Sequence, residues 1–233
     1  MTRFQRIMAT FVVCVATLLC LLTLGASRAS ADLFTSELNI GNDAISGFTG
    51  PFGTVTVDLT TFDSAEITVA SNTVGGNIYL FGSVNAVDVD VNASSFSILG
   101  IDGFNAGTGF TPGPFTSGGS GNVDGLGTFN ATINSFDGFT HSSDSVTITL
   151  LNNGGTWTSA ADVLTPNADG NDAAAHIFVT SSPANASNGA IVTGFAGEGP
   201  SVPVPEPSSL ALLLTGLVGF AGIVGTRRRK LPA

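Results

Sequence analysis

Apolar and polar side chains alternate with a period of two along the middle of the chain. The clearest runs are Thr-Val-Thr-Val-Asp-Leu at 54–59, Ala-Glu-Ile-Thr-Val at 65–69 and Ser-Val-Thr-Ile-Thr-Leu at 145–150. This alternation is typical of strands with one buried face, and clusters of Gly, Asn, Asp and Pro separate the runs. Further runs of the same kind lie at 77–81, 84–91, 95–101, 128–133, 176–180 and 190–195. About ten short strands predict an all-β fold over residues 32–199, an antiparallel β-sandwich that is jelly-roll-like.

Residues 102–125 interrupt this pattern because glycine dominates them. The segment also contains Pro112 and Pro114, and it is long for a connection inside a compact domain. One interpretation is a mobile loop beside a binding face. The other, which we favour, is a surface insertion without a function of its own.

The N-terminal segment has the pattern of a secretory signal. Arg3 and Arg6 precede an apolar run at 7–24, and the small residues Ala29 and Ala31 follow it. We therefore predict a signal peptide over residues 1–31, forming a signal helix and cleaved after Ala31. An uncleaved N-terminal anchor is the alternative. Both cysteines lie in this segment, so cleavage leaves a chain without thiols or disulfides.

The C-terminal segment has three parts in a fixed order. Residues 200–207 form a Pro-rich linker that ends in Pro205-Glu206-Pro207, where proline excludes helix and inner strand. Residues 208–226 are apolar and predict a single transmembrane helix, of which residues 209–225 would span about 25 Å at 1.5 Å per residue. Residues 227–233 are a basic tail that we expect on the cytoplasmic side of the membrane. The basic residues of this tail are Arg227, Arg228, Arg229 and Lys230.

This tail resembles the PEP-CTERM sorting signal of exported proteins of Gram-negative bacteria. The resemblance rests on Pro205-Glu206-Pro207, on the glycine-containing apolar span and on the terminal basic cluster. It implies recognition by an exosortase, a membrane enzyme that processes such tails and passes proteins to the cell surface. It also implies an association with exopolysaccharide and biofilm matrix. We hypothesise that the exosortase reads Glu206, which is the only charge in the motif.

Basic and acidic residues lie in different parts of the chain: the basic ones in the two terminal segments and nearly all acidic ones between them. Between Asp32 and Val202 there is no Lys or Arg, whereas sixteen of the seventeen acidic residues lie there, giving a formal charge of −16 with histidine neutral. Such a surface repels nucleic acid and anionic membrane faces. It also excludes a lysine Schiff base or a phosphate-binding lysine from this region. We therefore expect no nucleic-acid partner.

Calcium is the best candidate among metals. The only histidines, His141 and His176, are 35 residues apart and have no cysteine partner, which disfavours zinc. Asp88, Asp90 and Asn92 alternate along one face of a predicted strand, and residues 167–172 read Asn-Ala-Asp-Gly-Asn-Asp. Both segments supply the oxygen ligands that hard cations prefer. The EF-hand pattern is absent, and a solvated acidic loop is the default interpretation. The candidate ligands are Asp88, Asp90, Asp169 and Asp172.

No catalytic residue is predicted. The chain lacks the Gly-x-Ser-x-Gly motif of serine hydrolases. Its many carboxylates leave a polysaccharide-acting hydrolase as an alternative, because glycosidases need two carboxylates at close range. A carbohydrate-binding module is a further alternative, for which Trp157 and Tyr79 are the only Trp and Tyr available for stacking on sugars.

The sequence therefore predicts an exported, non-catalytic protein with a structural or adhesive role in the envelope or biofilm matrix. It would be anchored in the membrane through its C-terminus and then reach the cell surface or the extracellular matrix. The expected partners are the Sec translocon, signal peptidase, the exosortase and the membrane, with exopolysaccharide as a further candidate. No cofactor is expected apart from the calcium candidate.

Overall fold

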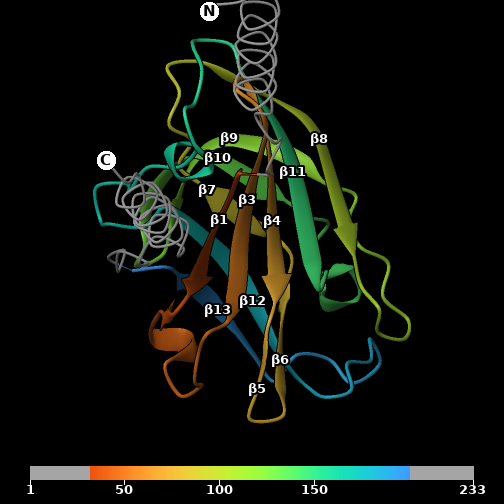
Figure 1. Ribbon diagram of the computed structural model, residues 1–233. Helices are drawn as coiled ribbons and strands as arrows, with labels where there is room; N and C mark the ends of the chain where they lie inside the picture. The colour runs from red at the N-terminus through yellow and green to blue at the C-terminus, as the bar shows by residue number, and fades with distance from the viewer. Residues whose placement is uncertain (1–31, 200–233) are drawn as a thin grey trace, which may run out of the picture. The chain divides into compact units, whose positions relative to one another are not determined.

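The computed structural model describes residues 32–199 (Figure 1). The predicted signal peptide at 1–31, the linker at 200–207, the transmembrane helix at 208–226 and the tail at 227–233 lie outside the described residues. Among residues 32–199, no helix has the length and apolar character needed to cross a membrane.

Five strands form the first sheet, which we call sheet A. Their order is β1-β3-β4-β11-β8, and every neighbouring pair is antiparallel. The strands are β1 (Asp32–Leu38), β3 (Gly53–Thr61), β4 (Ser64–Ser71), β11 (Ser145–Asn152) and β8 (Phe96–Phe104). The alternating runs at 54–59, 65–69 and 145–150 are thus neighbours in one sheet, as Figure 1 shows for β3, β4 and β11.

The second sheet, sheet B, has eight strands. Its main order is β2-β13-β12-β7-β10-β9, and β6 pairs with both β12 and β5. The strands are β2 (Ile40–Gly41), β5 (Thr73–Val74), β6 (Asn77–Phe81), β7 (Val87–Val89), β9 (Thr116–Val123), β10 (Gly127–Asn134), β12 (Ala173–Ser181) and β13 (Val192–Gly197). The only helical elements among residues 32–199 are the 3₁₀ turns η1 (Asp43–Ile45), η2 (Phe139–His141) and η3 (Ala160–Asp162).

The hydrophobic core fills the space between the two sheets. In sheet A, the register aligns Val57, Ile67 and Ile148 across three strands, and all three side chains are fully buried. Val87 and Ile177 enter the same cluster from sheet B. The predicted all-β fold with antiparallel sheets is confirmed, and two sheets around one core are the arrangement of a β-sandwich.

The prediction of one long loop at 102–125 was wrong. β8 continues to Phe104, and β9 occupies residues 116–123 as an edge strand paired with β10. Glycine is required in β9 because a β-carbon on Gly118 would come within 2.5 Å of Thr132 and 2.6 Å of Asn134. The glycines therefore allow close approach to β10 instead of marking a loop. Only residues 105–115 connect β8 to β9.

Candidate functional site

A pair of aspartates lies on the outer face of sheet B, where β7 meets the start of β12. Val87 and Val89 point into the core, so Asp90, one position further, points outward. Val89 pairs with Ala173, and the Asp90 N–H donates to the carbonyl of Asp172 at 2.9 Å. Asp90 and Asp172 therefore lie opposite each other, one residue beyond the paired ends of β7 and β12.

The Asp90 and Asp172 carboxylates differ in their hydrogen-bond partners. One oxygen of Asp90 accepts a hydrogen bond from the backbone N–H of Asn130 at 3.1 Å, and the Asn130 side chain in turn pairs with both backbone groups of Val91. Asp172 is only 8% exposed, and its Oδ1 is buried without a hydrogen-bond partner among residues 32–199. Burial raises the pKa of Asp172, and the charge of Asp90 raises it further.

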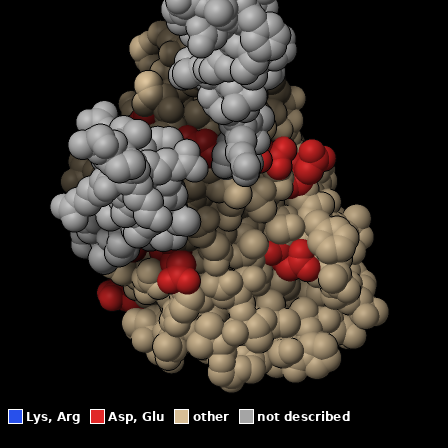
Figure 2. Space-filling view, in the orientation of Figure 1, with Lys and Arg blue, Asp and Glu red and all other residues tan. Residues whose placement is uncertain are grey.

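The pKa of Asp90 is also raised, because partial burial outweighs the hydrogen bond from Asn130. Both carboxylates are thus held where their charged forms cost free energy. No Lys or Arg exists between residues 32 and 199 to compensate them. In Figure 2, the visible face of the described residues shows red carboxylates and no blue cation.

Glu198 lies next to this pair, and the sequence analysis did not identify it. Its N–H donates to the carbonyl of Ala173, which brings the residue beside the start of β12. Its side chain accepts a hydrogen bond from the Ser36 hydroxyl on β1 of sheet A. Burial and the charge of Asp172 raise the pKa of Glu198 to about 7. No linear pattern could have identified this residue, since only the pairing of β12 with β13 brings it to the cluster.

Asp88 lies on the same face as Asp90 but is fully enclosed. It is 0% exposed, it pairs in register with Ala174 and Thr132, and neither carboxylate oxygen has a partner among the described residues. Burial alone raises the pKa of Asp88 well above its ordinary value. This environment therefore disfavours the charged form of Asp88, because an unpaired buried carboxylate costs several kcal/mol.

The two asparagine side chains of the loop at 167–172 are hydrogen-bonded to backbone groups. The side-chain amides of Asn167 and Asn171 both donate to the carbonyl of Leu126, each at 3.0 Å. The side-chain oxygen of Asn167 accepts from the N–H groups of Asp169 and Asn171, closing the loop on itself. The Asp169 carboxylate lies over Gly127, where a β-carbon would collide with it.

The structure thus brings together two of the four predicted calcium ligands. Asp90 and Asp172 face each other, Asp88 is buried two positions along β7, and Asp169 lies against the turn between β9 and β10. Within residues 32–199, no three His, Cys, Asp or Glu side chains are close enough to hold one metal ion together. A cage of several protein carboxylates is therefore not assembled.

Each histidine is held by contacts with neighbouring residues: His141 by backbone carbonyls and His176 by aromatic rings. His141 Nδ1 lies 2.9 Å from the carbonyl of Thr111 and 2.8 Å from that of Gly113, which ties the 105–115 connection to η2. The ring of His176 stacks between Phe178 and Phe195, with centroids at 5.2 and 4.6 Å. Burial lowers the pKa of His176.

The only Trp and Tyr available for stacking on sugars under the carbohydrate-binding alternative are both in the core. Trp157 is 2% exposed, and its indole N–H donates to the carbonyl of Asn92 at 2.8 Å. Tyr79 is fully buried, and its hydroxyl donates to the carbonyl of Thr49 at 2.7 Å. Neither ring offers a face to a sugar.

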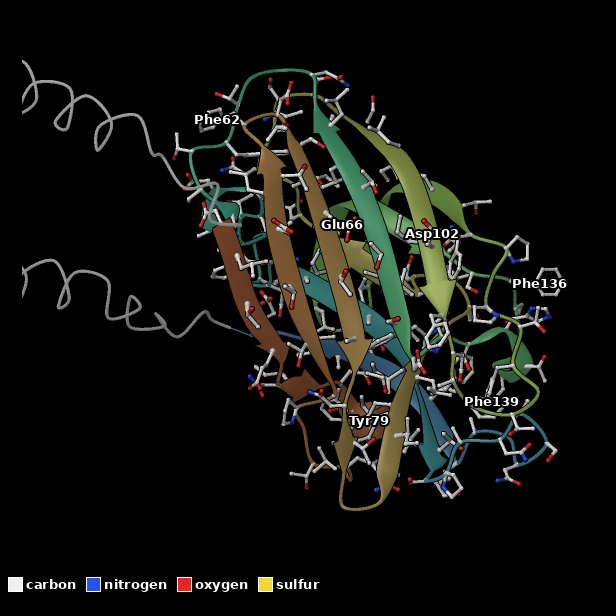
Figure 3. All side chains as sticks on the ribbon, turned by 45° about the vertical axis from the view of Figure 1, so that its right-hand side comes forward. Phe62, Glu66, Tyr79, Asp102, Phe136 and Phe139 are labelled. Atoms are coloured by element: carbon white, nitrogen blue, oxygen red, sulfur yellow. The ribbon has the colours of Figure 1, made fainter. Side chains whose placement is uncertain are left out.

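The outer face of sheet A is hydroxyl-rich. The register aligns one outward residue from each strand in a row, formed by Thr35, Thr56, Thr68, Thr147 and Asp102. The Thr68 and Thr147 hydroxyls are hydrogen-bonded at 3.0 Å. Figure 3 labels Asp102 in this row and Glu66 in the next. This face presents small polar side chains and carboxylates.

Comparison with known proteins identifies the C-terminal segment. Residues 203–230 match the PEP-CTERM protein-sorting motif. This chain carries a PEP-CTERM sorting signal. The matched span contains Pro205-Glu206-Pro207 and the four residues from Arg227 to Lys230, so the resemblance stated above is confirmed. The signal indicates export, membrane-associated sorting at the C-terminus and processing by an exosortase. No curated protein and no solved structure matches the chain.

Proposed function

We propose that this protein is an exported, non-catalytic component of the cell surface or extracellular matrix. Its jelly-roll-like sandwich serves a structural or adhesive role after an exosortase releases it from the membrane. The match of residues 203–230 to the PEP-CTERM sorting motif is the observation that carries the proposal. The hydroxyl-rich outer face of sheet A supports it, because rows of exposed hydroxyl and carboxylate groups can hydrogen-bond a hydrated polymer.

The sorting step is tested by expressing the full chain in a host with its exosortase and in the same host without it. We expect the enzyme to shorten the C-terminus and to move the protein from the membrane fraction to the surface or the medium. Mass spectrometry of both mature termini reads the result and also locates the signal cleavage predicted after Ala31. Identical termini and identical fractionation in the two hosts would refute exosortase processing.

The role of Glu206 is tested by Glu206→Ala. If the exosortase reads this carboxylate, the variant stays unprocessed in the membrane fraction. Glu37→Ala is the matched control, because Glu37 is an exposed glutamate of β1 outside the matched span. Normal processing of Glu206→Ala would eliminate this residue as the recognised group.

The matrix role is tested by replacing residues 32–199 with an unrelated exported β-sandwich while both terminal segments are kept. We expect the replacement to be sorted normally but to weaken the cohesion of the host matrix. Unchanged cohesion would contradict the role. Release of reducing ends from the exopolysaccharide by the purified chain would instead favour the hydrolase alternative.

A further inference from the structure

Two Asn-Gly pairs occur between residues 32 and 199, Asn153-Gly154 and Asn188-Gly189. In such a pair the backbone nitrogen of the glycine can attack the side-chain carbonyl carbon of the asparagine. Glycine favours this attack because it has no β-carbon to obstruct the approach and because its backbone adopts many conformations. The two pairs differ in whether the surrounding structure leaves the reacting groups free.

The Asn153-Gly154 pair is held by hydrogen bonds on both reacting groups. The Gly154 N–H donates to the carbonyl of Ser95 at 3.1 Å and to the side-chain oxygen of Asn152 at 3.0 Å. The Asn153 amide donates to the Ser97 hydroxyl at 2.8 Å. A β-carbon on Gly154 would come within 3.0 Å of the Ser95 backbone, so the segment is also closely packed. These contacts must break before the Gly154 nitrogen can reach the side chain.

The Asn188-Gly189 pair lies in the connection between β12 and β13, and none of these restraints applies to it. The Asn188 side chain is exposed, and the backbone N–H of Asn188 donates to the carbonyl of Asn185 at 3.0 Å. Neither the Asn188 side chain nor the Gly189 N–H has a hydrogen-bond partner among residues 32–199. No atom lies within 4 Å of the position that a β-carbon on Gly189 would take. Both reacting groups are therefore free in the folded domain.

We propose that Asn188 is a site of spontaneous deamidation in the folded domain. The Gly189 nitrogen loses its proton to solvent and bonds to Cγ of Asn188. The bond from Cγ to Nδ2 breaks, and the side-chain nitrogen takes a proton from water and leaves as ammonia. Water then opens the cyclic succinimide at either carbonyl, which gives an aspartyl or an isoaspartyl residue. Either product adds one carboxylate to a domain without Lys or Arg, and the reaction is independent of the proposed matrix role.

The test compares the folded chain in detergent micelles with the same chain in urea, both incubated at mildly alkaline pH. Peptic digestion in acid stops the reaction, and mass spectrometry measures the replacement of the side-chain NH₂ by OH at each asparagine. We expect Asn188 to convert at nearly the same rate in both samples. Asn153 should convert at least about tenfold more slowly in the folded chain than in urea, because its hydrogen bonds must first open. The urea sample shows that both pairs can react.

Substitutions identify the source of the new charge. Asn188→Gln should abolish most of the acidic shift that isoelectric focusing detects in the folded chain, because the larger ring that glutamine must form closes slowly. Asn153→Gln, the matched control at the other exposed pair, should keep the shift. An unconverted Asn188 in the folded chain beside a converted one in urea would overturn the proposal. So would equal rates at Asn153 and Asn188 in the folded chain, or a full acidic shift in Asn188→Gln.

Discussion

The Asn171 side chain joins three segments of the domain by hydrogen bonds, and replacing it should lower the free energy of unfolding. Its amide donates to the carbonyl of Leu126 at 3.0 Å, and its oxygen accepts the N–H of Gly199 at 2.9 Å. The side chain is only 4% exposed, so water cannot easily substitute for it. The residue thus joins the 167–172 loop, the β9–β10 turn and the end of β13.

The expected cost of Asn171→Ala follows from these two bonds. The Leu126 carbonyl keeps the amide of Asn167, so losing the first bond costs about 1 kcal/mol. The N–H of Gly199 is left buried and unpaired, which costs about 1–3 kcal/mol more. The total of about 2–4 kcal/mol is a large share of the roughly 5–15 kcal/mol that stabilises a typical domain.

Urea unfolding of the full chain measures this cost. Trp157 is the only tryptophan and lies in the core, so its fluorescence reports on the sandwich alone. With a slope of about 2 kcal/mol per molar urea, the midpoint should fall by about 1–2 M while the slope stays constant. Asn39→Ala is the control, since Asn39 is exposed and makes one long bond of 3.3 Å. If both variants lose less than about 0.5 kcal/mol, the reasoning about buried amides fails.

Three further outcomes are expected. Ile148→Ala should lower the free energy of unfolding by about 2–5 kcal/mol, because the side chain is fully buried. Thr147→Ala, on the outer face of the same strand, should lower it by about 1 kcal/mol or less. Equal losses of free energy by urea unfolding would contradict the assigned faces. Gly118→Val should destabilise the chain despite the strand preference of valine, because β10 blocks the β-carbon, while Gly155→Ala should be neutral in thermal unfolding. Burial lowers the pKa of His176, so this residue by itself destabilises the fold as pH drops below about 6.5, whereas Glu198, whose pKa burial raises to about 7, stabilises the fold as pH falls through that value. A pH series of melting temperatures should show His176→Phe gaining stability relative to the wild type as pH falls below about 6.5, and a constant difference between the two would exclude this histidine as a contributor.

The faces of the strands could be predicted from the sequence, but their partners could not. The alternation of Val55 and Val57 with threonines correctly assigned buried and exposed sides, because a period of two depends only on neighbouring residues. The pairing of β4 with β11 joins residues nearly eighty positions apart, and no local pattern encodes it. The same limit applies to Glu198, whose place beside Asp172 depends on strand pairing.

The glycine-rich composition of residues 102–125 led to the wrong prediction of one long loop, because glycine has a packing role there. Residues 116–123 have the composition of a loop, yet Gly118 and Gly121 fit against the Thr132 side chain on β10. Likewise, the carboxylates and amides of 167–172 resembled a calcium loop, although Asn167 and Asn171 bond to backbone groups. The sorting motif at 203–230 was predicted correctly, because its recognition depends on the order of residues along the chain and not on folding.

The absence of lysine and arginine from the domain determines which enzymes and reagents can act on it. Trypsin cuts after lysine or arginine, and none occurs from Ala29 to Thr226, so this protease has no site in the sandwich even when it is unfolded. Aldehyde fixatives and amine-reactive dyes likewise find no lysine there. Digestion at acidic residues and carbodiimide labelling of carboxyl groups are the chemistries that can detect this protein in a matrix.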